Sequence, residues 1–112
     1  MSTPEGKVKT KLCQALRVHF GRGMYLFMPV PMGLGATTLD YLICIDGVFI
    51  AIETKANGGK LTPRQKLTIA TINEAGGHTY VVDDKTDLPQ LIKNIEYDVT
   101  FRLARNERIR GF

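Results

Sequence analysis

The stretch that decides the fold runs from residue 39 to residue 55 and reads LDYLICIDGVFIAIETK. Two apolar runs flank Asp46-Gly47, and such a pair predicts a two-residue β-hairpin turn in which both residues have positive φ. If Ile45 then pairs with Val48, the same register places Asp40 directly opposite Glu53. Like charges facing each other destabilise a sheet. We therefore expect a positive group between the two carboxylates, and a divalent cation is the usual candidate.

Both predicted strands of this hairpin are largely apolar on both faces. One face carries Leu39, Tyr41, Ile43, Ile45, Val48, Ile50 and Ile52, and the other carries Leu42, Cys44, Phe49 and Ala51 and ends at Asp40, Glu53 and Lys55. Strands of this kind are typical of the centre of a sheet that helices cover. The carboxylate pair is therefore expected at the rim of a buried face.

The remaining sequence predicts an α/β domain around this hairpin. Thr3 and Pro4 begin a first helix that Gly21 and Gly23 end, and a short strand follows at residues 24–28. The later elements are a helix over residues 63–75, a strand over 78–82 and a short helix capped by Asp87. Strand, helix and strand with short joints predict a right-handed crossover and parallel pairing.

The chain of 112 residues suggests one domain spanning residues 1–112. Its last part, residues 97–112, is a basic tail for which the sequence leaves an edge strand, a helix and an arm open. A net charge of +4 suits an anionic partner such as nucleic acid, although a soluble basic protein explains the charge equally well.

Cys13 and Cys44 are expected to be small buried residues, which fits a reducing cytoplasm. The sequence shows no secretion signal and no apolar run near the roughly 20 residues of a membrane span, so no membrane partner is expected. The glycine pairs at 33/35 and 58/59 lack the lysine-serine continuation of a P-loop, which argues against a nucleotide cofactor.

The chemistry that Asp40 and Glu53 suggest depends on Lys55. Alternate residues of a strand share one face, so Lys55 is expected on the same face as Glu53. Two carboxylates and an ammonium group can bind Mg²⁺, activate a water and polarise a phosphoryl oxygen, and the Thr54 carbonyl lies between as a further ligand. The alternative is a structural salt bridge between Lys55 and Glu53. The register and the apolar surroundings favour the cation site.

Four further residues carry a functional and a structural interpretation each. Glu5 continues the inward stripe of the first helix and can reach the rim, or it only favours the helix start. Gln65 completes a capping box with Thr62, and its side chain can also face the site. Lys60 and Arg64 can grip backbone phosphates, or they are solvated surface charges.

The order Asp40, Glu53-Thr54-Lys55 and Gln65 resembles the VRR-NUC family of the PD-(D/E)XK nuclease superfamily. In that family a helix-borne Glu, an Asp, a Glu-x-Lys and a Gln ten residues beyond the Lys recur in this order. The likeness spans roughly residues 5–83, and the stretch 53–65 carries the core signature. One departure is Leu39, which stands where the family usually has proline.

The resemblance implies a restriction-endonuclease-like αβββαβ core with a mixed central sheet flanked by helices. It also implies Mg²⁺ or Mn²⁺ held by Asp40, Glu53 and the Thr54 carbonyl, a water-mediated or second position for Glu5, a catalytic Lys55 and a supporting Gln65. Small stand-alone members resemble homodimeric Holliday-junction resolvases, so branched DNA is the expected partner. A flap or duplex nuclease and a non-catalytic DNA-binding module remain alternatives.

Overall fold

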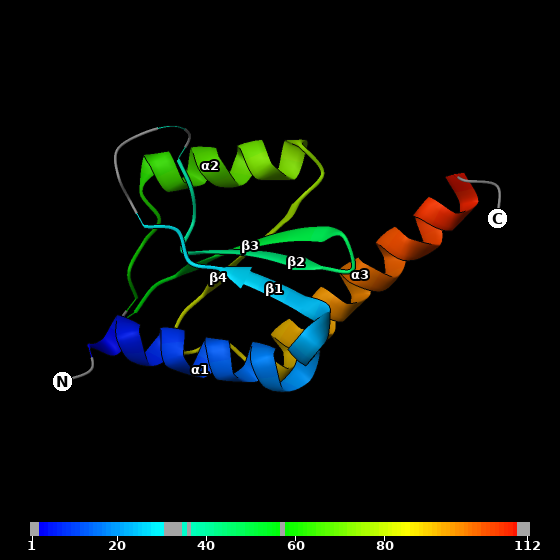
Figure 1. The fold of residues 1–112 in the computed structure, drawn as a ribbon. Helices are drawn as coiled ribbons and strands as arrows, with labels where there is room; N and C mark the ends of the chain where they lie inside the picture. Colours follow the sequence, from blue (N-terminus) through cyan, green and yellow to red (C-terminus); the bar gives the residue numbers. More distant parts are fainter. Residues whose placement is uncertain (1–2, 31–34, 36, 57, 110–112) are drawn as a thin grey trace.

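A four-stranded mixed sheet forms the centre of the computed structural model, which describes residues 3–30, 35, 37–56 and 58–109 (Figure 1). The elements follow the order α1 (Pro4–Phe20), a 3₁₀ turn (Gly21–Gly23), β1 (Met24–Phe27), β2 (Tyr41–Ile45), β3 (Val48–Thr54), α2 (Pro63–Glu74), β4 (His78–Val82) and α3 (Leu88–Ile109). The strands lie in the order β1-β2-β3-β4. The first three are antiparallel neighbours, and β4 runs parallel to β3. The predicted α/β class, the αβββαβ order and the parallel crossover are confirmed.

The hairpin has the register that its sequence predicts. Ile45 pairs with Val48, and the ladder continues to Tyr41 and Ile52. Asp46 has φ 49° and Gly47 has φ 81°, so both turn residues lie in the left-handed region that this turn requires. Asp40 and Glu53 are the next opposed positions beyond the last pair of the ladder. The turn therefore determines that these two residues meet.

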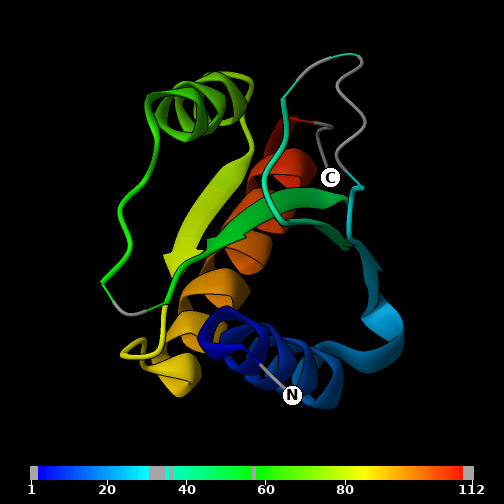
Figure 2. The ribbon, with the colours of Figure 1, turned by 90° about the vertical axis from the view of Figure 1, so that its left-hand side faces the viewer.

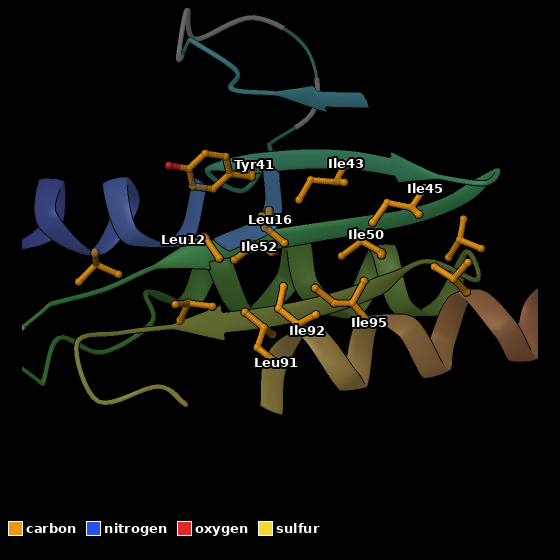
Figure 3. Close-up of a cluster of buried hydrophobic side chains, with 14 residues drawn as sticks. Leu12, Leu16, Tyr41, Ile43, Ile45, Ile50, Ile52, Leu91, Ile92 and Ile95 are labelled. Carbon is orange, nitrogen blue, oxygen red and sulfur yellow. The ribbon is translucent and has the colours of Figure 1, made fainter. Parts of the chain in front are cut away.

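Helices α1 and α3 cover one face of the sheet and enclose the hydrophobic core (Figures 2 and 3). Leu12 and Leu16 of α1 and Ile95 of α3 are completely or almost completely buried against the hairpin. The core is made of Val8, Leu12, Leu16, Tyr41, Ile43, Ile45, Val48, Ile50, Ile52, Val82, Leu91, Ile92, Ile95 and Val99. The hairpin face that carries Tyr41, Ile43 and Ile50 is thus buried, as its alternation predicted. Its packing in the core also fixes the ends of β2 and β3 beside the two carboxylates.

The last helix is longer than the sequence indicated. Asp87 accepts from the backbone of Gln90 and begins α3 as expected, but α3 has 22 residues instead of forming a short helix. Residues 97–109, left open above, are helical, and residues 110–112 lie outside the described residues. Ile95 and Val99 share a helical spacing of four and are both buried, so this segment packs as a helix and not as an edge strand.

The opposite face of the sheet is only partly covered, by α2 (Figure 1). Phe49 remains 42% exposed and Cys44 is exposed, whereas Cys13 is partly buried. The expectation that both cysteines are buried is therefore wrong, although helices flank the sheet as predicted. Alternation identifies residues suited to a sheet, but how far one helix extends over four strands is decided by tertiary packing. None of the described helices is long and apolar enough to span a bilayer.

Candidate active site

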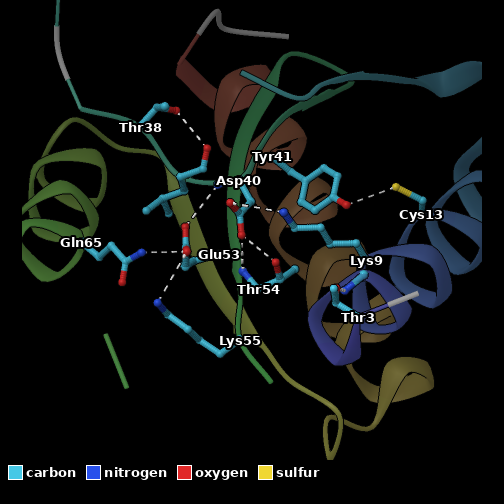
Figure 4. A network of polar contacts seen from close by, with 12 residues as sticks. Thr3, Lys9, Cys13, Thr38, Asp40, Tyr41, Glu53, Thr54, Lys55 and Gln65 are labelled. Atoms are coloured by element: carbon cyan, nitrogen blue, oxygen red, sulfur yellow. Dashed lines mark hydrogen bonds and ion pairs between the residues drawn. The ribbon is translucent and has the colours of Figure 1, made fainter. Parts of the chain in front are cut away.

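Asp40 and Glu53 lie together at the rim of the sheet, where β2 begins and β3 ends (Figure 4). The backbone N–H of Asp40 donates to Glu53 Oε1 over 3.2 Å. The Glu53 residue is 4% exposed, whereas 26% of the Asp40 side chain is exposed. The hairpin thus delivers one buried and one accessible carboxylate to the same place.

Thr54 holds the Asp40 carboxylate in position. Its backbone N–H donates to Asp40 Oδ2 over 2.9 Å, and its hydroxyl donates to the same oxygen over 2.6 Å. Thr54 itself is fully buried. Since both bonds go to Oδ2, the orientation of the carboxylate is determined, and Oδ1 accepts neither of them.

Lys55, directly after β3, and Gln65, in the first turn of α2, both lie beside the Glu53 carboxylate. Gln65 Nε2 donates to Glu53 Oε2 over 2.8 Å, and Lys55 Nζ lies 3.9 Å from that oxygen. The Gln65 side chain also completes the predicted capping box, because its Oε1 accepts from the backbone N–H of Thr62 over 2.9 Å. The two interpretations of Gln65 are therefore both correct in geometry: one side chain begins α2 and contacts the carboxylate pair.

The environment of Glu53 raises the pKa of its carboxyl from 4.5 to about 7. Burial is the largest cause, followed by the negative charge of Asp40, while Lys55 and the Asp40 N–H act in the opposite direction. Lys55 thus offsets only part of the cost of placing two carboxylates together. A further cation would favour the ionised form of Glu53.

Among the described residues, Lys9 of α1 is a second cation at the pair. Its Nζ lies 3.9 Å from Asp40 Oδ1, and its side chain is 35% exposed. The neighbouring lysines Lys7 and Lys11 are exposed and line a different cavity, together with Asp83, Asp84 and Asp87. Among the lysines of α1, the structure therefore brings Lys9 to the carboxylates.

Three predicted residues are less closely connected to this cluster. The Glu5 side chain is exposed, and its charge is the smallest influence on the pKa of Glu53. Lys60 and Arg64 are exposed beside the start of α2, so they are accessible to an anionic partner. A ligand role for Glu5 and phosphate contacts for Lys60 and Arg64 stay predictions.

The donor chemistry of the cluster fits a hard divalent cation. Two carboxylates meet at a partly open rim, where burial and then the charge of Asp40 raise the pKa of Glu53, and a cation would favour the ionised form of Glu53. Asp40 and Glu53 would hold such an ion, with the Thr54 carbonyl as the predicted third ligand. In the described part of the chain, no three His, Cys, Asp or Glu side chains gather as a metal-binding group, so water would complete the coordination.

Sequence reasoning missed two contributions to this site. The Thr54 hydroxyl was available as a signal, since a hydroxyl in a buried strand needs a partner. Lys9 had no comparable signal, because four lysines or arginines of α1 lie outside its apolar stripe. Only the way α1 crosses the sheet distinguishes Lys9 from the others.

Comparison with known proteins identifies the fold. No protein-family model and no curated protein sequence matches the chain. A solved structure described as a VRR_NUC domain matches with a TM-score of 0.67 and 21% sequence identity, over 82% of this chain and 97% of that chain. The site described above lies in the region that carries the sequence resemblance. This chain has the α/β fold of a VRR_NUC domain.

Proposed function

We propose that this protein is a metal-dependent nuclease that hydrolyses phosphodiester bonds of DNA. The observation that carries the proposal is the cluster around Glu53: a buried carboxylate beside Asp40, with Lys55 and Gln65 both directed at Glu53 Oε2. A carboxylate pair with an adjacent ammonium group, on the fold of a VRR_NUC domain, suits in-line attack on a phosphate.

Each residue has a separate task in this mechanism. Asp40, oriented by Thr54, and Glu53, oriented by Gln65, bind Mg²⁺ or Mn²⁺, with Glu5 acting through a water. The bound cation supplies Lewis-acid chemistry and lowers the pKa of water. Lys55 orients the attacking water or neutralises charge that develops on the phosphate. Lys60 and Arg64 contact backbone phosphates at the start of α2.

The substrate we propose is branched DNA, with the four-way Holliday junction first and flap or linear duplex DNA as alternatives. The support is the resemblance to small VRR-NUC resolvases. The described residues form one such carboxylate cluster, whereas paired cuts across a symmetric junction need two sites related by a two-fold axis. The active form is then a homodimer, acting in the cytoplasm, that of the host if phage-encoded.

Cleavage of three DNA substrates by four variants tests the proposal. Asp40→Asn and Lys55→Ala should abolish cutting of four-way, flap and linear DNA in Mg²⁺ or Mn²⁺ while the circular dichroism spectrum stays native. Asp46→Asn in the hairpin turn and Lys85→Ala on the surface are matched controls that should cut normally. Unchanged cleavage by Asp40→Asn or Lys55→Ala would contradict the nuclease assignment, and native mass measurement reports the oligomer.

A non-catalytic DNA-binding module is the competing function, because Lys9 and Lys55 already pair with the two carboxylates. In that case the cluster is a structural ion network. Thermal unfolding with increasing Mg²⁺ or Mn²⁺ separates the two functions, since a ligand that binds only the folded state raises its stability. A melting temperature that does not respond to either cation, together with intact DNA-binding, would favour the binding module.

A further inference from the structure

The ammonium group of Lys9 occupies a particular place at the carboxylate pair. Both Thr54 bonds go to Asp40 Oδ2, and Lys9 Nζ faces Oδ1 at 3.9 Å. Glu53 Oε1 accepts from the Asp40 backbone, and Oε2 faces Gln65 and Lys55. The Asp40 oxygen that Thr54 does not bind is therefore in contact with an ammonium group.

The arrangement gives Lys9 two different electrostatic environments. In the protein without a cation, Lys9 compensates the charge of Asp40, as Lys55 does for Glu53. If Asp40 and Glu53 held a divalent cation, the same ammonium group would face a positive charge at that site, and attraction would become repulsion. A flexible four-carbon stem with 35% exposure lets the group move outward.

A phosphate is the partner that Lys9 can reach after that displacement. Because a nuclease cleaves a phosphate held next to its metal, a phosphate of bound DNA would be the nearest new anion for an ammonium group that leaves Asp40. α1 is anchored by Val8 on one side of Lys9 and by Leu12 beyond it, both buried, which keeps the Lys9 backbone in place while its side chain moves.

We propose that Lys9 exchanges partners during the catalytic cycle: its ammonium group holds Asp40 Oδ1 in the free protein, yields that oxygen to the divalent cation, and then binds a backbone phosphate of the DNA. Lys9 thereby weakens cation binding in the absence of DNA and strengthens DNA binding once its ammonium group has left Asp40. This inference rests on the proposed function and adds a residue that none of the sequence motifs identified.

Two measurements on Lys9→Met test the exchange, with Lys7→Met as the control that removes the same charge from the same helix. Without DNA, Lys9→Met should bind Mn²⁺ about three- to tenfold more tightly than the wild type by calorimetry, because a repelling charge is gone. In Ca²⁺, with gels to check that the four-way junction stays intact, Lys9→Met should bind the junction more weakly than the wild type. The slope of log K for junction binding against log salt concentration should become shallower by about 0.9.

Lys9→Arg keeps the positive charge, so it should show the wild-type Mn²⁺ affinity and the wild-type junction binding. Lys7→Met should leave the Mn²⁺ affinity unchanged. If the wild type binds Mn²⁺ and DNA, and Lys9→Met has the same Mn²⁺ affinity, DNA affinity and salt dependence, the exchange is contradicted and the proposed function stands. A wild-type protein that binds neither Mn²⁺ nor DNA would overturn the proposed function and the exchange together. Tighter Mn²⁺ binding with an unchanged salt slope would overturn the phosphate step.

Discussion

The backbone N–H of Asp40 donates to the carboxylate of Glu53, so the two acidic residues are joined by a hydrogen bond although their charges repel. Burial and the charge of Asp40 nevertheless raise the pKa of the Glu53 carboxyl to about 7, and the hydrogen bond from the Asp40 N–H offsets only part of that rise. Near neutral pH the ionised form of Glu53 is therefore disfavoured in the folded protein unless a cation compensates its charge.

Glu53 should make the cation-free protein less stable as the pH rises from about 4.5 to about 7. The folded state keeps the proton in this range and the unfolded state, with the ordinary pKa of 4.5, does not, so raising the pH favours unfolding. The shift corresponds to at most about 3 kcal/mol. Urea unfolding with a chelator at pH 5 and pH 8 measures it.

Glu53→Gln is the control for this titration, because it keeps the shape and cannot ionise. Its urea midpoint should change less between pH 5 and pH 8 than that of the wild type, and Mg²⁺ should reduce the wild-type loss at pH 8. Equal pH dependence of the two proteins would show that Glu53 does not titrate in this range.

Thr54 and Asp40 should be energetically coupled through the 2.6 Å hydroxyl bond. Thr54→Val, which removes the donor at nearly constant volume, should cost about 1–3 kcal/mol in the wild type because the acceptor is charged. The cost should be smaller when Asp40 is already alanine. A double-mutant cycle by urea unfolding measures the coupling.

The matched cycle pairs Asp40→Ala with Thr71→Val, whose hydroxyl donates to the Leu67 carbonyl within α2. These two changes share no partner and should be additive. A coupling for Thr54 no larger than that for Thr71 would contradict the role of Thr54 in orienting Asp40.

The Gln65 side chain should contribute more to the stability of the fold than a helix cap alone does. Gln65→Ala loses the bond to the Thr62 N–H and the bond to Glu53, whereas Thr62→Ala loses only the other half of the capping box. We expect Gln65→Ala to destabilise the protein by about 1–3 kcal/mol and by more than Thr62→Ala. Thermal and urea unfolding measure both, and equal losses would mean that the Glu53 contact contributes nothing.

The hairpin turn should be sensitive to a side chain at Gly47. Gly47 has φ 81° and open space where a Cβ would lie, so Gly47→Ala is strained by the backbone alone and should cost about 1–2 kcal/mol. Gly23→Ala is the control, because Gly23 has open space and no such φ. Similar stabilities of the two variants in urea would refute the strained turn.

Much of the site is determined by local sequence. Asp46-Gly47 sets the register, the register places Asp40 opposite Glu53, and period two adds Lys55; all three steps depend only on neighbouring residues and on strand geometry. The start of α2 is equally local, since Thr62, Pro63 and Gln65 encode a capping box. The sequence resemblance then indicated the fold, which the structural comparison bears out.

The tertiary structure alone decided which distant residues join these. Lys9 reaches Asp40 because buried residues of α1 dock against the hairpin, and a helix has no preference of its own for which of its lysines that docking selects. The exposure of Cys44 and Phe49 likewise depends on how far α2 extends over the sheet. Local pattern thus determined the carboxylate pair and Lys55, whereas long-range packing decided the approach of Lys9 and the exposure of the outer face of the sheet.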